Sequence, residues 1–198
     1  GRSWFWGPEA NTATMEFYRD APGGSRLVQY FDKSRMEINN PAGDPNSPFF
    51  VTNGLLVVEM ISGRMQVGDS SYEPRDPANV NVSGDFDDPN APTYRSFQGV
   101  ANTSLGDHKA PDRTGQKATG TINRAGTVGN DPAKATVPNV DFVHYEAGVG
   151  HNIPRAFWDF LNQSGPIFEN GQTRNDRLIN PWYYASGLPI SEPYWASV

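Results

Sequence analysis

The sequence predicts a mainly-β fold, a barrel or sandwich of short antiparallel strands with one short helix near residues 154–162. Glycine (20 residues) and proline (17 residues) are abundant, and both are typical of tight turns between short strands. Runs rich in β-branched and aromatic residues recur along the chain, bounded by Gly, Pro, Asp or Asn. One segment breaks this pattern and has the spacing of an amphipathic helix.

The strands are predicted from these runs. The segment 26–38 (RLVQYFDKSRMEI) alternates and stops at Asn39-Asn40-Pro41, which predicts a strand pair or one long strand. The segment 55–67 (LLVVEMISGRMQV) is predicted to form a hairpin with its break at Gly63. Further strands are expected at 79–83, 93–98, 117–123 and 140–147, and a long surface loop at 101–116.

The helix is predicted from Pro154 to Leu161. Ala156, Phe157, Phe160 and Leu161 fall at helical spacing, with Asn152 as the expected cap and Gly165 as the stop. A tight turn is expected at 167–172.

Charge and composition exclude several classes of function. A net charge of -6 argues against a phosphate-binding surface, which must concentrate Lys and Arg, so no nucleic-acid partner is expected. The longest apolar run, Leu55–Val58, is far shorter than the about 20 residues of a membrane span, so no membrane insertion is expected. The absence of cysteine excludes disulfides and thiolate chemistry and favours a bacterial exported protein. Because the chain opens at Gly1 without a signal-like region, we expect a processed piece whose targeting segment lies outside it.

Two segments carry a resemblance to a known family. Residues 184–192 (YASGLPISE) resemble the glycine-x-proline core of LGFP-type repeats, which recur in secreted, cell-wall-associated bacterial proteins. Residues 28–35 (VQYFDKSR) are similar to the strand that follows such a core in related surface repeats. The whole chain resembles a family of exported bacterial proteins with these elements, which implies a secreted or cell-surface location and attachment to the envelope.

The same motifs suggest how the chain is organised. Trp6-Gly7-Pro8 echoes Gly187-Leu188-Pro189, so residues 1–53 are expected to be an N-terminal repeat-like unit. Residues 54–150 would form a β core, and 151–198 the helix plus an incomplete C-terminal repeat-like unit, all within one compact domain. The strand that should close the C-terminal repeat is missing. An unpaired strand edge needs a partner, either the N-terminal strand or a neighbouring molecule, which predicts self-association.

Candidate catalytic and metal sites are few. Glu146 and His151 could serve metal-assisted hydrolysis if they converge with His144, but His151 could equally hydrogen-bond the helix start. Glu37 and Glu59 are alternatively a glycosidase pair or ordinary surface carboxylates. Calcium is the one cofactor considered, because one acidic turn concentrates oxygen ligands, although such residues also suit any surface turn. Its candidate ligands are Asp85, Asp87, Asp88 and Asn90.

Aromatic residues gather towards both ends of the chain. Sugar rings present apolar C–H faces, so flat aromatic side chains near amides and carboxylates suit a saccharide platform, whereas the alternative is that these rings form core. The platform candidates are Trp182, Tyr183, Tyr184, Tyr194 and Trp195.

Together these observations predict an extracellular, cell-envelope-associated structural or binding module with no catalysis of its own. It would self-associate or adhere to surface polysaccharide. The alternative is a secreted hydrolase that acts on glycan or cell-wall substrates through Glu146 and His151.

Overall fold

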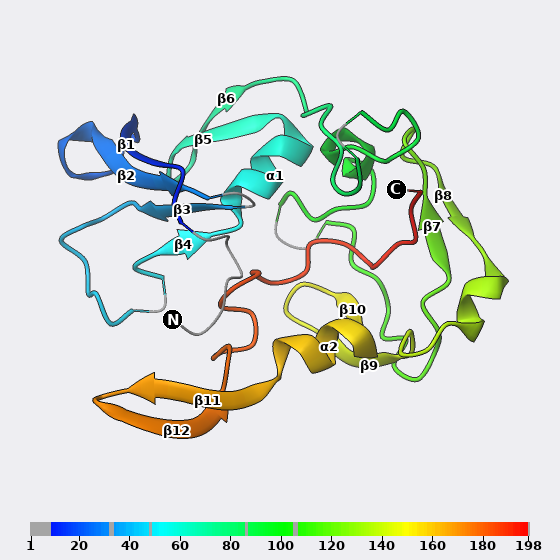
Figure 1. Ribbon diagram of the computed structural model, residues 1–198. Helices are drawn as coiled ribbons and strands as arrows, with labels where there is room; N and C mark the ends of the chain where they lie inside the picture. Colours follow the sequence, from blue (N-terminus) through cyan, green and yellow to red (C-terminus); the bar gives the residue numbers. More distant parts are fainter. Residues whose placement is uncertain (1–8, 32–33, 48, 86, 105–106, 198) are drawn as a thin grey trace.

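The computed structural model describes residues 9–31, 34–47, 49–85, 87–104 and 107–197. Its strands form one four-stranded and four two-stranded antiparallel sheets (Figure 1). Two short α-helices accompany them, where the sequence predicted one. The mainly-β prediction is confirmed, but the described strands form separate small sheets that close no barrel, and sandwich packing stays a prediction. The motif Trp6-Gly7-Pro8 lies outside the described residues.

The four-stranded sheet has its charged face inward. Val28 and Glu37 pair across its central strands and are buried, as is Arg26. Met15 pairs with Leu27 on the opposite face, and both are exposed. The strands, in order, are β1 (Thr12–Phe17), β2 (Ser25–Tyr30), β3 (Arg35–Ile38) and β4 (Thr52–Asn53). Because β2 pairs with β3, the strand pair predicted for 26–38 is confirmed.

Residues 55–62 are helical, and the strand predicted there is wrong. Helix α1 (Leu55–Ser62) lies between Gly54 and Gly63, which both have left-handed backbones with φ of 86° and 69°. A short apolar run has no period that separates a buried strand from a helix, and a glycine in this conformation ends helices well. Only the second half of the predicted hairpin is a strand, where β5 (Arg64–Gly68) pairs with β6 (Ser71–Pro74).

Two of the other predicted strands are present. Within 140–147 lies β9 (Phe142–Glu146), and within 117–123 lies β7 (Gly120–Ile122), which pairs with β8 (Val128–Asn130). The described part of 101–116 contains no helix or strand, as expected for a loop.

The other two predicted strands are not formed. The strand predicted at 93–98 is wrong, because Tyr94–Phe97 is a short 3-10 helix. Thr93 and Ser96 close a capping box there, which favours a helical turn over an extended chain. Residues 79–83 contribute only an isolated bridge.

Helix α2 (Arg155–Leu161) confirms the helix predicted near 154–162. It follows β10 (His151–Pro154), the partner of β9. Asn152 is not its cap: the N-cap is Pro154, and the Asn152 side chain bonds to residues 111 and 113 and to Glu192 instead. The helix ends before Gly165, which belongs to the next strand.

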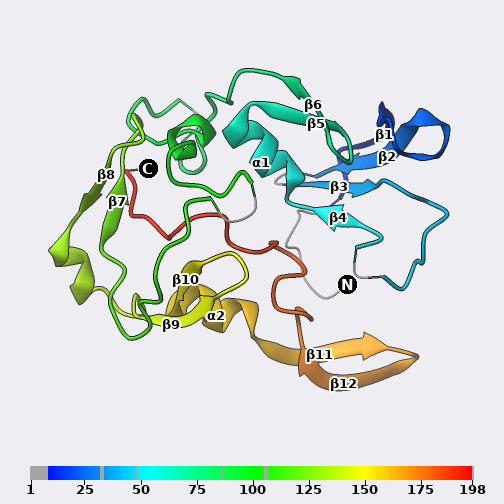
Figure 2. The same cartoon turned by 180° about the vertical axis from the view of Figure 1, so that it is seen from behind.

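A hairpin extends away from the body after α2 (Figures 1 and 2). Its strands are β11 (Ser164–Glu169) and β12 (Gln172–Arg177). Asn170 and Gly171 join them with φ of 51° and 77°, the backbone that two-residue hairpin turns require. The tight turn predicted at 167–172 is confirmed, although the flanking strands were not predicted.

Residues 181–195, here called the central segment, cross the middle of the molecule from β12 to β7 (Figures 1 and 2). Asn53 Nδ2 donates to the Tyr184 carbonyl at 3.0 Å, and Ile122 N donates to the Trp195 carbonyl at 2.9 Å. The repeat-like residues 184–192 therefore do not pair with β2, which lies between β1 and β3. The central segment instead joins the separate sheets.

Candidate functional site

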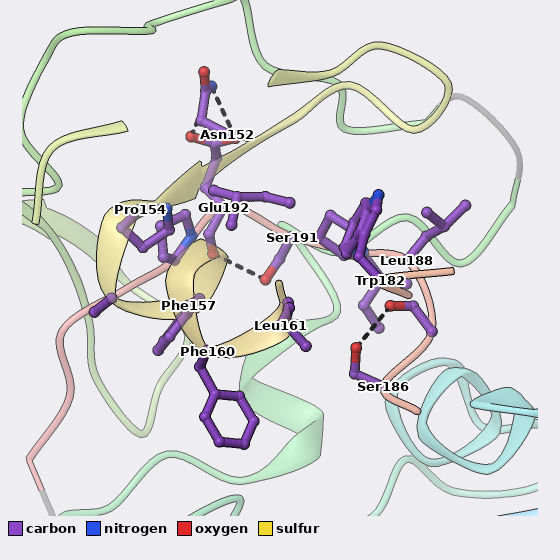
Figure 3. A pocket seen from close by; sticks show the side chains of 16 residues that line it. Asn152, Pro154, Phe157, Phe160, Leu161, Trp182, Ser186, Leu188, Ser191 and Glu192 are labelled. Atoms are coloured by element: carbon purple, nitrogen blue, oxygen red, sulfur yellow. Dashed lines mark hydrogen bonds between the residues drawn. The ribbon is translucent and has the colours of Figure 1, made fainter. Parts of the chain in front are cut away.

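An apolar groove of about 710 Å³ lies between helix α2 and the central segment. This volume is within the range of small-molecule sites. Figure 3 shows Phe157, Phe160 and Leu161 on the helix side, with Trp182 and Leu188 across from them. Most of the residues that line the groove are apolar.

The sequence of α2 explains the helix wall. Phe157, Phe160 and Leu161 are spaced three and four residues apart, so they share one face of the helix. Phe157 is 58% exposed and Phe160 is 49% exposed. Large apolar side chains normally face the core, so this exposed face indicates a surface used for contact.

The opposite wall is held by an aromatic cluster, defined as His144, Trp158, Trp182 and Tyr183. The His144 and Trp158 rings stack with their centroids 4.1 Å apart and an interplanar angle of 15°. Trp182 lies 5.4 Å from Trp158 and 5.5 Å from Tyr183, in tilted and edge-on contacts. Such contacts stabilise aromatic pairs beyond their buried area. Trp182, which also lines the groove, is therefore held in a fixed orientation.

The floor of the groove is polar and centres on Glu192. Its Oε1 accepts a hydrogen bond from the Asn152 backbone N–H at 2.8 Å, and its Oε2 accepts one from Arg113. His151 Nδ1 lies 3.5 Å from Oε1, which is too long for a good hydrogen bond. The Glu192 carboxylate is therefore fully engaged with the protein.

These contacts decide the ionisation of Glu192. Burial alone would raise the pKa of its carboxyl group, but His151, the Asn152 N–H and Arg113 together bring the pKa below its ordinary value. A carboxylate with a lowered pKa and several donors is a poor proton donor or acceptor. Glu192 therefore shapes the groove rather than supplying acid or base.

The predicted catalytic pair is divided between two environments. The β9–β10 register places Glu146 directly opposite His151. However, the Glu146 side chain lies 3.4 Å from His144 Nε2 and accepts from Gly148 N, whereas His151 is completely buried beside Glu192. Neither Glu146 nor His151 lines the groove. The structure therefore pairs Glu146 with His144 rather than with His151, and the two side chains of the predicted pair do not share one cavity.

The predicted saccharide platform is split. Trp182 lines the groove, and Tyr183 and Tyr184 line an adjoining cavity of about 370 Å³ that shares the wall 186–188 with it. These three candidates therefore line two neighbouring cavities with a common wall.

Tyr194 and Trp195 lie elsewhere, at β7. Trp195 packs on the small buried cluster of Ala118, Val140 and Phe142, and its Nε1 donates to the Ala118 carbonyl at 2.7 Å. Burial raises the pKa of Tyr194, as expected for a ring that is partly core. This agrees with the alternative that some of the aromatic rings are structural.

Hydrogen bonds within the protein hold the acidic turn that was predicted to bind calcium. Arg124 Nη1 donates to the carbonyl oxygens of Asp88 and Ala91 and to Asn81 Oδ1. Among the described residues no group of three or more His, Asp or Glu side chains is arranged to hold a metal ion. Calcium at Asp85, Asp87, Asp88 and Asn90 stays a prediction.

Arg35 bridges the two carboxylates considered as a glycosidase pair. Its Nε donates to Glu37 at 2.6 Å and its Nη1 donates to Glu59 at 2.8 Å. Glu59 belongs to helix α1, not to a strand beside Glu37. With a cation between them, these carboxylates form a buried ion-pair network rather than an acid and a nucleophile.

Nothing in the sequence indicated that several of these residues belong to the site. Phe157 and Phe160 were predicted only as apolar positions of an amphipathic helix, although a spacing that gives one apolar face is also what a helical groove wall requires. His144 was considered as a metal ligand or as a residue on the surface of a strand, and its stacking on Trp158 depends on the packing of α2 against β9. The bond from Arg113 to Glu192 spans 79 residues, a distance that local patterns do not reveal.

Comparison with known protein families, with curated proteins and with solved structures found no match to this chain. The resemblance to LGFP-type repeats therefore stays a prediction. No helix in the described ranges is long and apolar enough to span a bilayer.

Proposed function

We propose that this chain is a secreted, cell-envelope-associated binding module and that its groove binds surface polysaccharide without chemistry of its own. The observation that carries this proposal is Trp182, which the aromatic cluster holds against the groove opposite the exposed Phe157. A rigid ring loses little conformational freedom when a ligand stacks on it. Rigid aromatic walls of this kind suit the apolar C–H faces of sugar rings.

The charges of the groove indicate the kind of glycan. Among the described residues, Glu192 is the one charged residue that lines it, and that carboxylate is engaged by Arg113 and Asn152. No lysine or arginine in the described part of the chain lines the groove to pair with an acidic sugar. A neutral polysaccharide is therefore the preferred ligand.

The hydrolase alternative has less support. Glu146 and His151 lie outside the groove, and His151 is completely buried. A module that binds without cleaving leaves the length of its glycan unchanged. Sizing the polysaccharide after incubation with the protein distinguishes the two functions, because a hydrolase would shorten it.

The binding experiment uses the whole chain with a panel of neutral and acidic polysaccharides in affinity gel electrophoresis. Trp182→Ala is expected to weaken retardation by a neutral glycan about tenfold or more, because a central aromatic anchor is lost. Phe168→Ala is the matched control, since Phe168 is 73% exposed on the hairpin away from the groove. The proposal would be contradicted if the two variants were retarded equally. It would also be contradicted if the parent protein migrated equally in gels with and without glycan.

Self-association is a second candidate function, favoured by one observation. Strand β1 is an edge of the four-stranded sheet, and its Met15 and Phe17 are exposed. An exposed apolar edge strand can pair with a second molecule. Light scattering tests this candidate: a dimer or larger assembly that Met15→Lys dissociates supports it, and a monomer at high concentration counts against it.

A further inference from the structure

Strand β1 has one free edge. In its sheet it pairs with β2 alone, and five of its six residues are exposed. Among the described residues, no main-chain hydrogen bond joins residues 13–17 to an element other than β2. A free strand edge carries a row of N–H and C=O groups onto which another strand can pair. This edge is separate from the groove, because no residue of β1 lines it.

The register identifies the main-chain groups at this edge. Tyr18 N donates to the Gly24 carbonyl at 3.0 Å, which continues the β1–β2 register beyond Phe17. In an antiparallel pair, residues that bond to the partner strand alternate with residues whose N–H and C=O point away from it. The even-numbered residues of β1 therefore bond to β2. The N–H and C=O groups of Ala13, Met15 and Phe17 point to the free edge.

The bonds on the other side of β2 agree with this assignment. Phe31 N donates to the Ser34 carbonyl at 2.8 Å, so the odd-numbered residues of β2 bond to β3 and its even-numbered residues to β1. Two of the odd-numbered residues of β1 are also exposed and apolar, since Met15 is 58% exposed and Phe17 is 60% exposed. The free main-chain groups and the exposed apolar side chains therefore belong to the same residues.

The edge of β1 lacks the features that keep other strand edges from pairing. Proteins protect such edges with charged residues, proline, bulges or short strands. Residues 12–17 contain one charged residue and no proline, and the β1–β2 register is unbroken. That charge, on Glu16, is held within its own sheet by the Tyr30 hydroxyl at 2.6 Å. By contrast, the opposite edge strand β4 has only two residues, and β12 carries three charged side chains.

The residues of β1 match a second copy of the same strand. Two identical strands that pair antiparallel about a two-fold axis place one residue opposite itself, and opposite residues share a face. With the axis at Met15, Phe17 lies opposite Ala13 of the partner subunit, so a large apolar side chain meets a small one. Glu16 then lies opposite Thr14 of the partner subunit, and no like charges face each other.

The neighbouring registers fit less well. With the axis at Thr14, Phe17 lies opposite Asn11 of the partner subunit, and its exposed ring has no apolar residue opposite it. With the axis at Glu16, the two Glu16 carboxylates face each other, which is destabilising. Met15 is thus the position of the axis at which both exposed apolar side chains meet apolar partners.

We propose that two copies of this chain pair through their β1 strands about a two-fold axis at Met15, so that their four-stranded sheets become one continuous sheet. The inference rests on self-association, the second candidate function above, and adds its surface, symmetry and register. In the pair, the main-chain groups of Ala13, Met15 and Phe17 bond to those of the partner subunit, as strand addition requires.

The chain contains no cysteine, so single introduced cysteines can report this register. Opposite residues of a hydrogen-bonded antiparallel pair have Cα atoms about 5.5 Å apart, within the range that a disulfide spans. Met15→Cys is expected to give a disulfide-linked dimer on mild oxidation, read on a non-reducing gel. Phe17→Cys alone should not, because its two copies lie about 13 Å apart. A mixture of Ala13→Cys and Phe17→Cys should give the mixed dimer, identified by its intact mass.

Met15→Pro tests the main-chain bonds directly. The Met15 N–H points away from β2, so proline there keeps the β1–β2 bonds but removes a donor from the free edge. Light scattering is expected to show the parent as a dimer and Met15→Pro as a monomer, with circular dichroism confirming that the variant is folded. Phe168→Ala, which changes an exposed apolar residue of the β11–β12 hairpin, is the control and should remain a dimer.

Two results would overturn the proposal, and they separate it from the functions proposed above. A parent that stays monomeric at high concentration overturns this pairing together with self-association. A dimer in which Met15→Cys does not cross-link, or in which Thr14→Cys does so instead, overturns the axis at Met15 and leaves self-association standing. Glycan should retard Met15→Pro as it retards the parent, because β1 lies outside the groove, so the glycan proposal is tested separately.

Discussion

The backbone N–H of Asn152 donates to Glu192 Oε1 across 2.8 Å, although the two residues are 40 positions apart in the chain. The Asn152 side-chain amide adds contacts of 3.2 Å to both carboxylate oxygens. One carboxylate thus joins β10 to the central segment beneath the groove. The groove therefore depends on a polar contact that the ligand need not touch.

Replacing Glu192 with alanine is expected to lower the free energy of unfolding by about 3 kcal/mol, because the buried donors of Asn152 and the partly exposed guanidinium of Arg113 lose their acceptor. Urea denaturation followed by fluorescence measures the change. Glu169→Ala, on the exposed hairpin, is the control and should change stability by less than about 0.5 kcal/mol. Similar stabilities for the two variants would show that the Glu192 contacts contribute little.

The lowered pKa of Glu192 predicts a pH dependence. A carboxyl group whose folded pKa lies below its ordinary 4.5 stabilises the fold above that pH, and the contribution is lost as the pH falls through the folded pKa. The stability difference between the parent and Glu192→Gln should therefore be largest near neutrality and narrow in acid. Urea titrations from about pH 7 to about pH 3 measure it. A difference that stays constant over this range would contradict the assignment.

Arg35→Met is expected to cost about 3–5 kcal/mol at neutral pH, because it leaves the buried Glu37 carboxylate without its cation. Burial already raises the pKa of Glu37, and loss of Arg35 raises it further. A carboxyl with a raised folded pKa favours the fold when protonated, so part of the loss should be recovered as the pH is lowered. Arg75→Met, at an exposed pair with Glu73, is the control with a change near zero.

Gly63→Ala tests the end of helix α1. A Cβ there would lie 2.4 Å from the Arg75 carbonyl oxygen, in addition to the strain of φ +69°. Gly23 has a similar φ of +76° but nothing within 4 Å, so Gly23→Ala carries the backbone strain alone, about 1 kcal/mol. Thermal unfolding should show Gly63→Ala clearly less stable than Gly23→Ala. Equal melting temperatures would mean that the backbone near residue 75 shifts without cost.

Patterns of neighbouring residues in the sequence predicted those elements whose conformation depends on neighbouring residues alone. Helix α2 followed from the spacing of Phe157, Phe160 and Leu161, and the hairpin turn followed from Asn170-Gly171. The wrong prediction of a strand at 55–62 has a physical reason. The apolar run Leu55–Val58 suits a buried strand or a buried helix equally well, and the glycines on either side of 55–62 favour the helix.

The candidate site could be predicted only in part. Trp182 and Tyr183 were chosen for their chemistry, and the structure places both in the aromatic cluster. Trp195 was chosen for the same chemistry but packs on Phe142, because its backbone pairs with β7. Arg26 carried no signal, since an alternating strand gives no indication that its charged face is the buried one. Burial of a whole sheet face is a tertiary property.

The central segment gives this protein a late step in its biogenesis. Residues 184–195 leave the ribosome after every strand they join, from Asn53 on the four-stranded sheet to Ile122 on β7. The small sheets can form as the chain emerges, but they stay unlinked until residues 184–195 are synthesised, because the linking bonds span up to 131 positions.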